Sequence, residues 1–96
     1  MAYAEHYDYK IIFSKNAEKF LNSIDKKTGL RIIEKVKELP TNSKNLDIKK
    51  LKSKYDLYRL RVGNFRIIYS FQHEQLIIYV VVIGHRKDVY KNAYLV

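Results

Sequence analysis

Three arginines near the middle of the sequence, Arg59, Arg61 and Arg66, have the residue type and spacing to bind a phosphate group. Gly63-Asn64 between two alternating runs is typical of a two-residue hairpin turn, in which Arg61 faces Arg66. Because opposed residues and alternate residues share one face of a sheet, the three guanidinium groups should emerge together. Like charges so placed destabilise a strand pair, and their clustering therefore favours a surface that meets a polyanion.

A second group of candidates follows towards the C-terminus. Arg86 and Tyr90, four residues apart, would share one face of a short helix or turn, and His85 precedes them. The guanidinium group of arginine binds two phosphate oxygens at once and stabilises the extra negative charge of a phosphorane. The combined set therefore suits cleavage of RNA through attack of a ribose 2′-OH on the adjacent phosphate.

That reaction also needs a group that moves a proton, and a guanidinium does not lose its proton near neutrality. Histidine side chains titrate near neutrality, which makes His85 a candidate acid or base. Tyr90 is another, if neighbouring arginines ease the loss of its phenol proton. Both have structural alternatives: His85 could be a surface or C-capping residue, and Tyr90 could pack the final turn against the core.

Metal-dependent and nucleotide-binding sites find no support in the sequence. There is no cysteine, and the three histidines are scattered without carboxylates at ligand spacing. No P-loop, Ser-His-Asp arrangement or glycine-rich nucleotide motif occurs. We therefore expect metal-free chemistry and no cofactor.

Positive charge is concentrated around the central arginines. The net charge is +9, and residues 44–66 hold eight basic and two acidic residues. Such a zone indicates a polyanionic partner, either nucleic acid or an acidic protein segment. The alternative is a solvated surface that keeps the protein soluble. The lysines predicted to bind RNA are Lys49, Lys50, Lys52 and Lys54.

Secondary-structure patterns predict the frame that positions these residues. Alternation predicts a first strand over residues 7–13 with one aromatic face, and an apolar stripe predicts a helix that begins after Ser14. A second helix, capped by Asp25, is expected to run until Pro40 stops it.

The remainder of the chain is predicted to supply the rest of the sheet. Residues 41–47 are expected to form a surface loop, followed by one helical turn anchored by Ile48 and Leu51. The run over residues 76–83 is apolar on both faces, which predicts an interior strand between the first strand and residues 65–71.

These elements predict one compact α+β domain over residues 1–96, in the order β-α-α-β-β-β with a short C-terminal helix or turn. The sheet would be mainly antiparallel with about four strands. The N-terminal helical pair would cover its aromatic face and leave the arginine-bearing face open for a ligand or partner.

One expected feature conflicts with an open arginine-bearing face. A two-residue turn at His73-Glu74 would place four apolar side chains of the last strand on that face. They are Ile77, Tyr79, Val81 and Ile83. The C-terminal segment or a second protein would then have to cover them.

The N-terminal residues lack a basic segment followed by an apolar one, so a secretory signal is not expected. No apolar run is long enough to span a bilayer. We therefore expect a cytoplasmic protein without membrane association.

Three segments resemble the RelE toxin family within the RelE/ParE superfamily: residues 48–51 (Ile-Lys-Lys-Leu), the hairpin over residues 58–69, and residues 84–90 (Gly-His-Arg-Lys-Asp-Val-Tyr). ParE-like gyrase inhibitors share the hairpin, and the closing segment favours the RelE side. The predicted order of elements agrees with this family over residues 7–94.

The resemblance implies a toxin that enters the ribosomal A site, cleaves mRNA there without metal and so inhibits translation. A RelB-like antitoxin would hold it inactive, and it would contact DNA only through that complex. Arg66 and Arg86 would hold the scissile phosphate, and Tyr90 would stack on or orient a base. The four lysines would grip ribosomal RNA.

Arg59 and Arg61 fall where members of the family often carry lysines, one of which is assigned proton transfer. This departure leaves the base open: His85 could act, or the arginines could act only electrostatically while the ribosome positions the nucleophile. Two other functions stay open as well, a ParE-like DNA gyrase inhibitor and a degenerate member that binds only its antitoxin and operator DNA.

Overall fold

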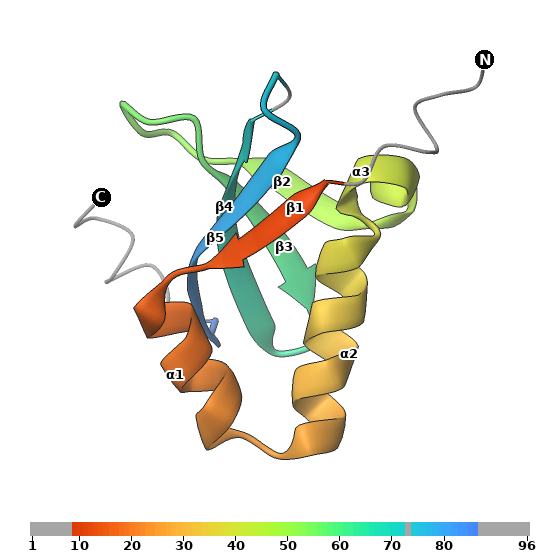
Figure 1. The fold of residues 1–96 in the computed structure, drawn as a ribbon, viewed down its shortest axis with the longest axis vertical. Helices are drawn as coiled ribbons and strands as arrows, with labels where there is room; N and C mark the ends of the chain where they lie inside the picture. Colours follow the sequence, from red (N-terminus) through yellow and green to blue (C-terminus); the bar gives the residue numbers. More distant parts are fainter. Residues whose placement is uncertain (1–8, 73, 87–96) are drawn as a thin grey trace.

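The computed structural model of the protein describes residues 9–72 and 74–86. Its centre is one five-stranded sheet with the strand order β1-β5-β4-β3-β2 (Figure 1). Strands β1 and β5 are parallel, and the other neighbours are antiparallel. In chain order the elements are β1 Lys10–Phe13, α1 Lys15–Ser23, α2 Lys26–Lys37, α3 Leu39–Asn42, the 3-10 helix η2 Ser43–Asn45, β2 Asp47–Lys50, β3 Tyr58–Val62, β4 Phe65–Gln72 and β5 Ile77–His85.

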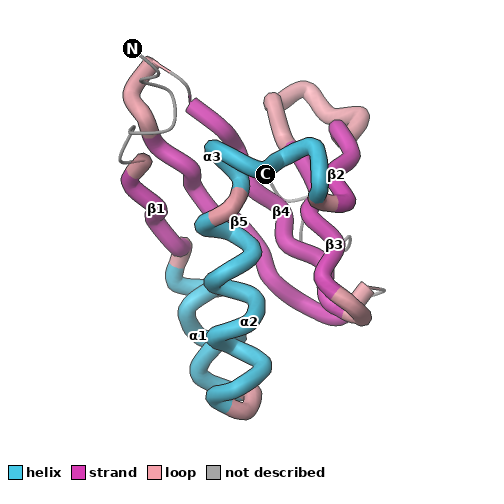
Figure 2. The backbone as a smooth tube through the Cα atoms, turned by 90° about the vertical axis from the view of Figure 1, so that its right-hand side faces the viewer, coloured by secondary structure: helices cyan, strands magenta, loops and turns pink. Residues whose placement is uncertain are grey.

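Helices α1 and α2 both lie on one side of the sheet, and in Figure 2 the pair extends beyond the strands at one end. We call the sheet face that they cover the helix face, and the opposite one the arginine face. Ala17 of α1 and Ile32 and Val36 of α2 are fully buried against apolar side chains of the sheet such as Leu60 and Ile67. This confirms the predicted α+β class and the predicted cover of the aromatic face.

Both helices begin at their predicted capping residues. The Ser14 hydroxyl accepts a hydrogen bond from the Ala17 N–H at 3.0 Å and donates one to the Val81 carbonyl at 2.6 Å, which ties the start of α1 to β5. The Asp25 carboxylate accepts from the hydroxyl and the N–H of Thr28. These bonds hold the pKa of the Asp25 carboxyl below its usual value.

Strands β3 and β4 form the predicted hairpin, with Val62 opposite Phe65 and Arg61 opposite Arg66. Gly63 has a φ of 59°, a left-handed conformation that glycine adopts without steric cost and that the first central position of a type II′ turn requires. The predicted register of the hairpin is therefore confirmed.

The segment between α2 and β3 differs from the prediction. Helix α2 ends at Lys37, and Pro40 lies in the first turn of α3, where its missing N–H costs no hydrogen bond. The predicted loop and helical turn form α3, η2 and β2 instead. In β2 only Ile48 is half-buried, and the strand pairs with β3 along its whole length. The sheet thus has five strands where about four were expected.

The pairing of β4 with β5 also differs from the prediction. The connecting loop holds four residues rather than two, since Gln72 pairs with Ile77. A β-bulge then inserts Val81 as an extra residue of β5 opposite Ile68 and Tyr69. One inserted residue moves every later side chain of the strand to the other face.

The bulge shows that the predicted place of Ile83 on the arginine face was wrong. Ile83 belongs to the main core under the helices, and Val82 takes the arginine face instead. That face carries a small second apolar cluster, made of Leu51, Leu57, Ile68, Val81 and Val82. The loop between β2 and β3 supplies two of these residues, so the chain itself covers this part of the face.

Two further predictions extend past the described residues. Strand β1 begins at Lys10 rather than at residue 7, and residues 1–8 are not described. The predicted C-terminal helix or turn falls beyond Arg86 and is likewise outside the described part. Within that part, none of the helices is long and apolar enough to span a membrane.

Candidate functional site

Arg66 lies beside the hairpin turn on the arginine face. It is only 8% exposed, and its Nη1 donates hydrogen bonds to the carbonyl oxygens of Gly63 and Phe65, each at 3.1 Å. These bonds hold the guanidinium against the turn. Arg66 therefore stabilises the hairpin and at the same time places a permanent positive charge at its tip.

Arg59 and Arg61 share a single acidic partner on the edge strand. Asp47 of β2 lies opposite Arg61, and its Oδ1 is 2.6 Å from Arg59 Nη2. The Arg59 side chain is largely buried, and its Nε has no hydrogen-bond partner among the described residues. Arg61 lies further from Asp47 and is more exposed. Of the two, Arg61 is thus the better placed to meet a ligand.

Arg86 is brought to the same end of the sheet by its backbone. Its N–H donates to the Asn64 carbonyl at 3.1 Å, and Gly84, two residues earlier, pairs with Arg66. Arg86 is exposed. The end of β5 therefore meets the hairpin turn, so that Arg66 and Arg86, 20 positions apart in the sequence, lie at the same end of the sheet.

His85 lies on the other side of the sheet. It pairs with Phe65, and its ring lies 5.1 Å from the Phe65 ring and 5.8 Å from the Phe20 ring of α1, measured between centroids. The structure therefore separates His85 from the arginines and packs it against the helix face. Tyr90 lies outside the described residues.

All four lysines predicted to bind RNA are exposed. Lys49 pairs with Arg59 and so lies on the arginine face. Lys50 pairs with Tyr58, and its Nζ lies 5.9 Å from the centroid of that ring. Lys52 and Lys54 belong to the loop that follows. The lysines thus border the sheet at the β2 edge rather than form one plane with the arginines.

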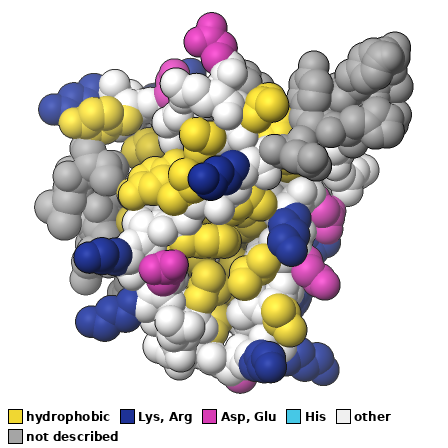
Figure 3. Space-filling model, in the orientation of Figure 1, with side chains coloured by type: hydrophobic (Ala, Val, Ile, Leu, Met, Phe, Trp, Pro, Cys, Tyr) yellow, Lys and Arg dark blue, Asp and Glu magenta, His cyan; other side chains and the backbone are white. Residues whose placement is uncertain are grey.

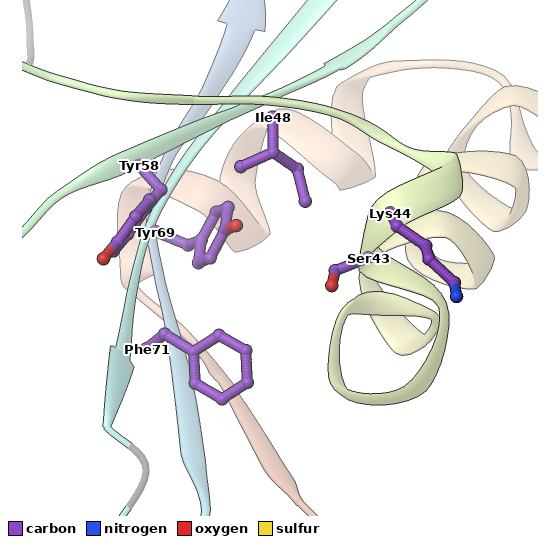
Figure 4. Close-up of a pocket in the computed structure, with 6 residues that line it drawn as sticks. All are labelled: Ser43, Lys44, Ile48, Tyr58, Tyr69 and Phe71. Atoms are coloured by element: carbon purple, nitrogen blue, oxygen red, sulfur yellow. The ribbon is translucent and has the colours of Figure 1, made fainter.

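The helix side of the molecule carries a separate hollow. It holds about 340 Å³ and is lined by Ser43, Lys44, Ile48, Tyr58, Tyr69 and Phe71 (Figure 4). Tyr58 and Tyr69 stack with their ring centroids 5.7 Å apart. Burial, with a smaller contribution from Tyr58, raises the pKa of Tyr69 to about 12. On this side apolar side chains gather across the middle of the surface, with lysines and arginines around them (Figure 3).

The chemistry available on the arginine face is that of permanent cations. Within residues 9–72 and 74–86, no three His, Asp or Glu side chains lie close enough to hold a metal ion. Arg61, Arg66 and Arg86 can bind phosphate oxygens and stabilise negative charge that develops on them. The carboxylate of Asp47 lies near Arg61, but it is ion-paired with both Arg59 and Arg61.

Comparisons with known proteins agree with one another on the type of protein. The family model described as "ParE toxin of type II toxin-antitoxin system, parDE" matches residues 11–90. Toxin RelE3 of Methanocaldococcus jannaschii is 35% identical over 85 residues, which cover 84% of this chain and 94% of the relative.

Two solved structures share the fold. The archaeal RelE-RelB complex from Pyrococcus horikoshii OT3 contains a chain that matches with a TM-score of 0.71 and 27% identity, over 86% of this chain and 100% of that one. The RelB-RelE antitoxin-toxin complex from Methanococcus jannaschii matches with a TM-score of 0.66 and 31% identity, over 82% and 94% of the two chains.

Sequence reasoning missed Asp47 as a member of the arginine cluster. Asp47 lies in a segment that we interpreted as a loop. Its pairing with Arg61 therefore could not be predicted. The four-residue strand Asp47–Lys50 has one half-buried side chain and therefore too short an alternation to be recognised.

Proposed function

The chain belongs to the RelE/ParE superfamily of toxins of type II toxin–antitoxin systems, and we propose that it is a ribosome-dependent endoribonuclease that cleaves mRNA in the ribosomal A site. The observation that supports this proposal is that Arg66 lies beside the hairpin turn and that the Arg86 N–H bonds to Asn64 of the same turn. Two permanent cations, one on β4 and one directly after β5, thus belong to the same end of the sheet and could bind a phosphate group there.

In the proposed reaction, a ribose 2′-OH attacks the adjacent phosphate, the phosphorane gains negative charge, and the 5′-oxygen leaves with a proton. Arg66 and Arg86 would stabilise the phosphorane, with Arg61 adding positive potential from the neighbouring strand. Arg59, held by Asp47, would contribute charge and would not accept a proton.

The proton transfers need a group other than these arginines. His85 lies against Phe20 and Phe65 on the helix face, which disfavours it in this role. We therefore assign the role to Tyr90, four residues after Arg86, or to the ribosome that positions the nucleophile. In the same proposal the four exposed lysines would bind ribosomal RNA through its phosphates.

Regulation would come from an antitoxin. The solved relatives from Pyrococcus horikoshii and Methanococcus jannaschii are complexes of RelE with RelB. We propose that a RelB-like protein binds this chain and blocks it, that DNA is contacted only through this complex, and that the toxin acts in the cytoplasm.

The variant Arg86→Ala tests the proposed site with little risk to the fold, because Arg86 is exposed and is fixed through its backbone N–H. We expect it to abolish growth arrest when expressed in bacteria and to lose mRNA cleavage on ribosomes. Lys26→Ala is the matched control, since it removes one positive charge from the exposed start of α2. A toxic Arg86→Ala protein that still cut mRNA would refute the role of Arg86.

A DNA gyrase inhibitor is the alternative function. The matching family model is described as a ParE toxin, but the relatives in sequence and in structure reported above are RelE proteins, which favours the endoribonuclease. Such a protein would bind its target without cleaving nucleic acid. The products distinguish the two functions. Gyrase inhibition would produce trapped gyrase–DNA cleavage complexes and no cuts in mRNA.

A further inference from the structure

The arginine face carries a second hollow, far from the hairpin turn. It holds about 690 Å³ and lies between the loop that precedes β3 and the facing parts of β4 and β5. The lining residues that matter for its chemistry are Tyr55, Asp56, Ser70, Gln72 and Tyr79.

The strand register places this hollow on the same face as the arginines. Ser70 pairs with Tyr79, and Ser70 follows Arg66 by four residues on β4, so that both side chains share one face. At about 3.3 Å per residue, the two lie about 13 Å apart along the strand. A fully stacked strand advances about 3.4 Å per nucleotide and an extended one advances further, so at most about four nucleotides would span that distance.

Two tyrosines give the hollow aromatic surface. Tyr55 is 46% exposed and Tyr79 is 36% exposed, and with Leu30 they are the large apolar side chains that are exposed in the described part of the chain. A single exposed tyrosine needs no explanation. Two that line one hollow offer flat rings on which any nucleobase can stack. The Ser70 hydroxyl and the Gln72 amide lie in the same lining and can hydrogen-bond to the edge of a base.

Positive charge borders this aromatic surface. Lys54 Nζ lies 5.5 Å from the centroid of the Tyr55 ring, and Lys50 Nζ lies 3.4 Å from Asp56 Oδ1. Lys52 stands between these two lysines in the sequence and is also exposed. These lysines would not strengthen the binding of an apolar peptide, whereas they attract a sugar-phosphate backbone.

We propose that this hollow binds an unpaired nucleobase of single-stranded RNA against Tyr55 and Tyr79, within about four nucleotides of the phosphate held by Arg66 and Arg86. The inference rests on the proposed function, since it extends the path of the same RNA along the arginine face. In this proposal the tyrosines stack on bases, an interaction that tolerates any base, and the lysines attract the charged phosphates.

Fluorescence anisotropy of the full-length chain without ribosomes tests this site. The probes are a labelled oligouridylate and, as a competitor without bases, inorganic polyphosphate. Base stacking accounts for roughly 1–3 kcal/mol per base, so Tyr55→Ala and Tyr79→Ala should each weaken oligouridylate binding about fivefold or more and leave polyphosphate binding unchanged. Tyr79→Phe keeps the ring and should retain affinity, and Leu30→Ala is the control for loss of an exposed apolar side chain on α2.

Unchanged oligouridylate affinity in both alanine variants would overturn the proposal and favour a protein segment as the occupant. An equal loss of polyphosphate binding would also overturn it, because stacking would then not be the cause. If Tyr79→Ala does not fold, Tyr55→Ala in the exposed loop gives the same comparison. A wild-type protein that binds oligouridylate through these tyrosines, yet cuts no mRNA on ribosomes, would refute the proposed enzyme and leave the base site standing.

Discussion

Asp47 Oδ1 lies 2.6 Å from Arg59 Nη2, and Asp47 Oδ2 lies 3.7 Å from Arg61 Nε. One carboxylate on the edge strand β2 thus faces two arginines of β3. It offsets part of the repulsion between Arg61 and Arg66 across the hairpin, which explains how the sheet tolerates three clustered guanidinium groups. The Arg59 side chain is only 15% exposed. Its largely buried charge therefore depends on Asp47 more strongly than the charge of the exposed Arg61 does.

Removing this carboxylate should cost stability and increase the attraction for RNA. In Asp47→Ala the largely buried Arg59 loses a charged hydrogen-bond partner, and we expect the free energy of unfolding to fall by about 1–2 kcal/mol in urea titrations. Each guanidinium that is freed from Asp47 can bind a phosphate instead. The slope of log affinity against log salt concentration for single-stranded RNA should then become steeper by about 0.7 per guanidinium.

Asp56→Ala is the matched control for the stability measurement. Asp56 also pairs with a cation, Lys50, but its side chain is 84% exposed, and exposed pairs contribute about 0–1 kcal/mol. Equal losses of stability in the two variants would show that Asp47 has no special role.

Arg66 should contribute to the fold as well as to the site. Its Nη1 bonds to two carbonyl oxygens of the hairpin turn, and hydrogen bonds from charged groups contribute about 1.5–3 kcal/mol. Arg66→Ala should therefore lower the free energy of unfolding by about that amount, whereas the exposed Arg61→Ala should change it by less than about 1 kcal/mol. A fully stable Arg66→Ala protein would show that these bonds do not hold the turn.

Ser14 should link the first helix to the sheet. Ser14→Ala removes both the cap of α1 and the bond to the Val81 carbonyl at the bulge, for an expected loss of about 1–2 kcal/mol in thermal or urea unfolding. Ser23→Ala serves as the comparison, because the Ser23 hydroxyl makes one exposed bond to the Phe20 carbonyl at the end of the same helix. Its loss should stay within about 0.5 kcal/mol.

Tyr69 should make the fold sensitive to strongly alkaline pH. Its pKa is raised to about 12 by burial, while in the unfolded chain it has its ordinary value near 10. The folded state favours the protonated phenol, so its contribution to stability is intact below pH ~10 and is lost as the pH rises towards ~12, by about 2 kcal/mol. The difference in unfolding free energy between wild type and Tyr69→Phe should shift by that amount across this range. A constant difference would contradict the assignment.

The parts of the fold that sequence reasoning predicted correctly are those with local signals. Ser14 and Asp25 cap helices because their side chains can accept from nearby N–H groups, and Gly63 marks a turn because its conformation is unfavourable for other residues. Pro40 was misleading, since proline ends a helix from within but is tolerated in a first turn.

The register of β5 could not be predicted for a physical reason. The loop before it uses Leu76 at a φ of 54°, a conformation for which leucine gives no signal. A bulge cannot be recognised in a strand that is apolar on both faces, because its sequence does not alternate between polar and apolar residues. Continued alternation from Ile77 would have placed His85 on the arginine face, and the extra residue Val81 turns it to the helix face instead.

Mapping mRNA ends by primer extension, after the purified protein is added to a translating extract, decides whether this chain is a ribosome-dependent nuclease. We predict cuts within codons in the ribosomal A site. These cuts should disappear when ribosomes are removed and with Arg86→Ala, and they should persist with Lys26→Ala. Intact mRNA accompanied by trapped gyrase–DNA cleavage complexes would contradict this prediction, as would cuts that persist without ribosomes.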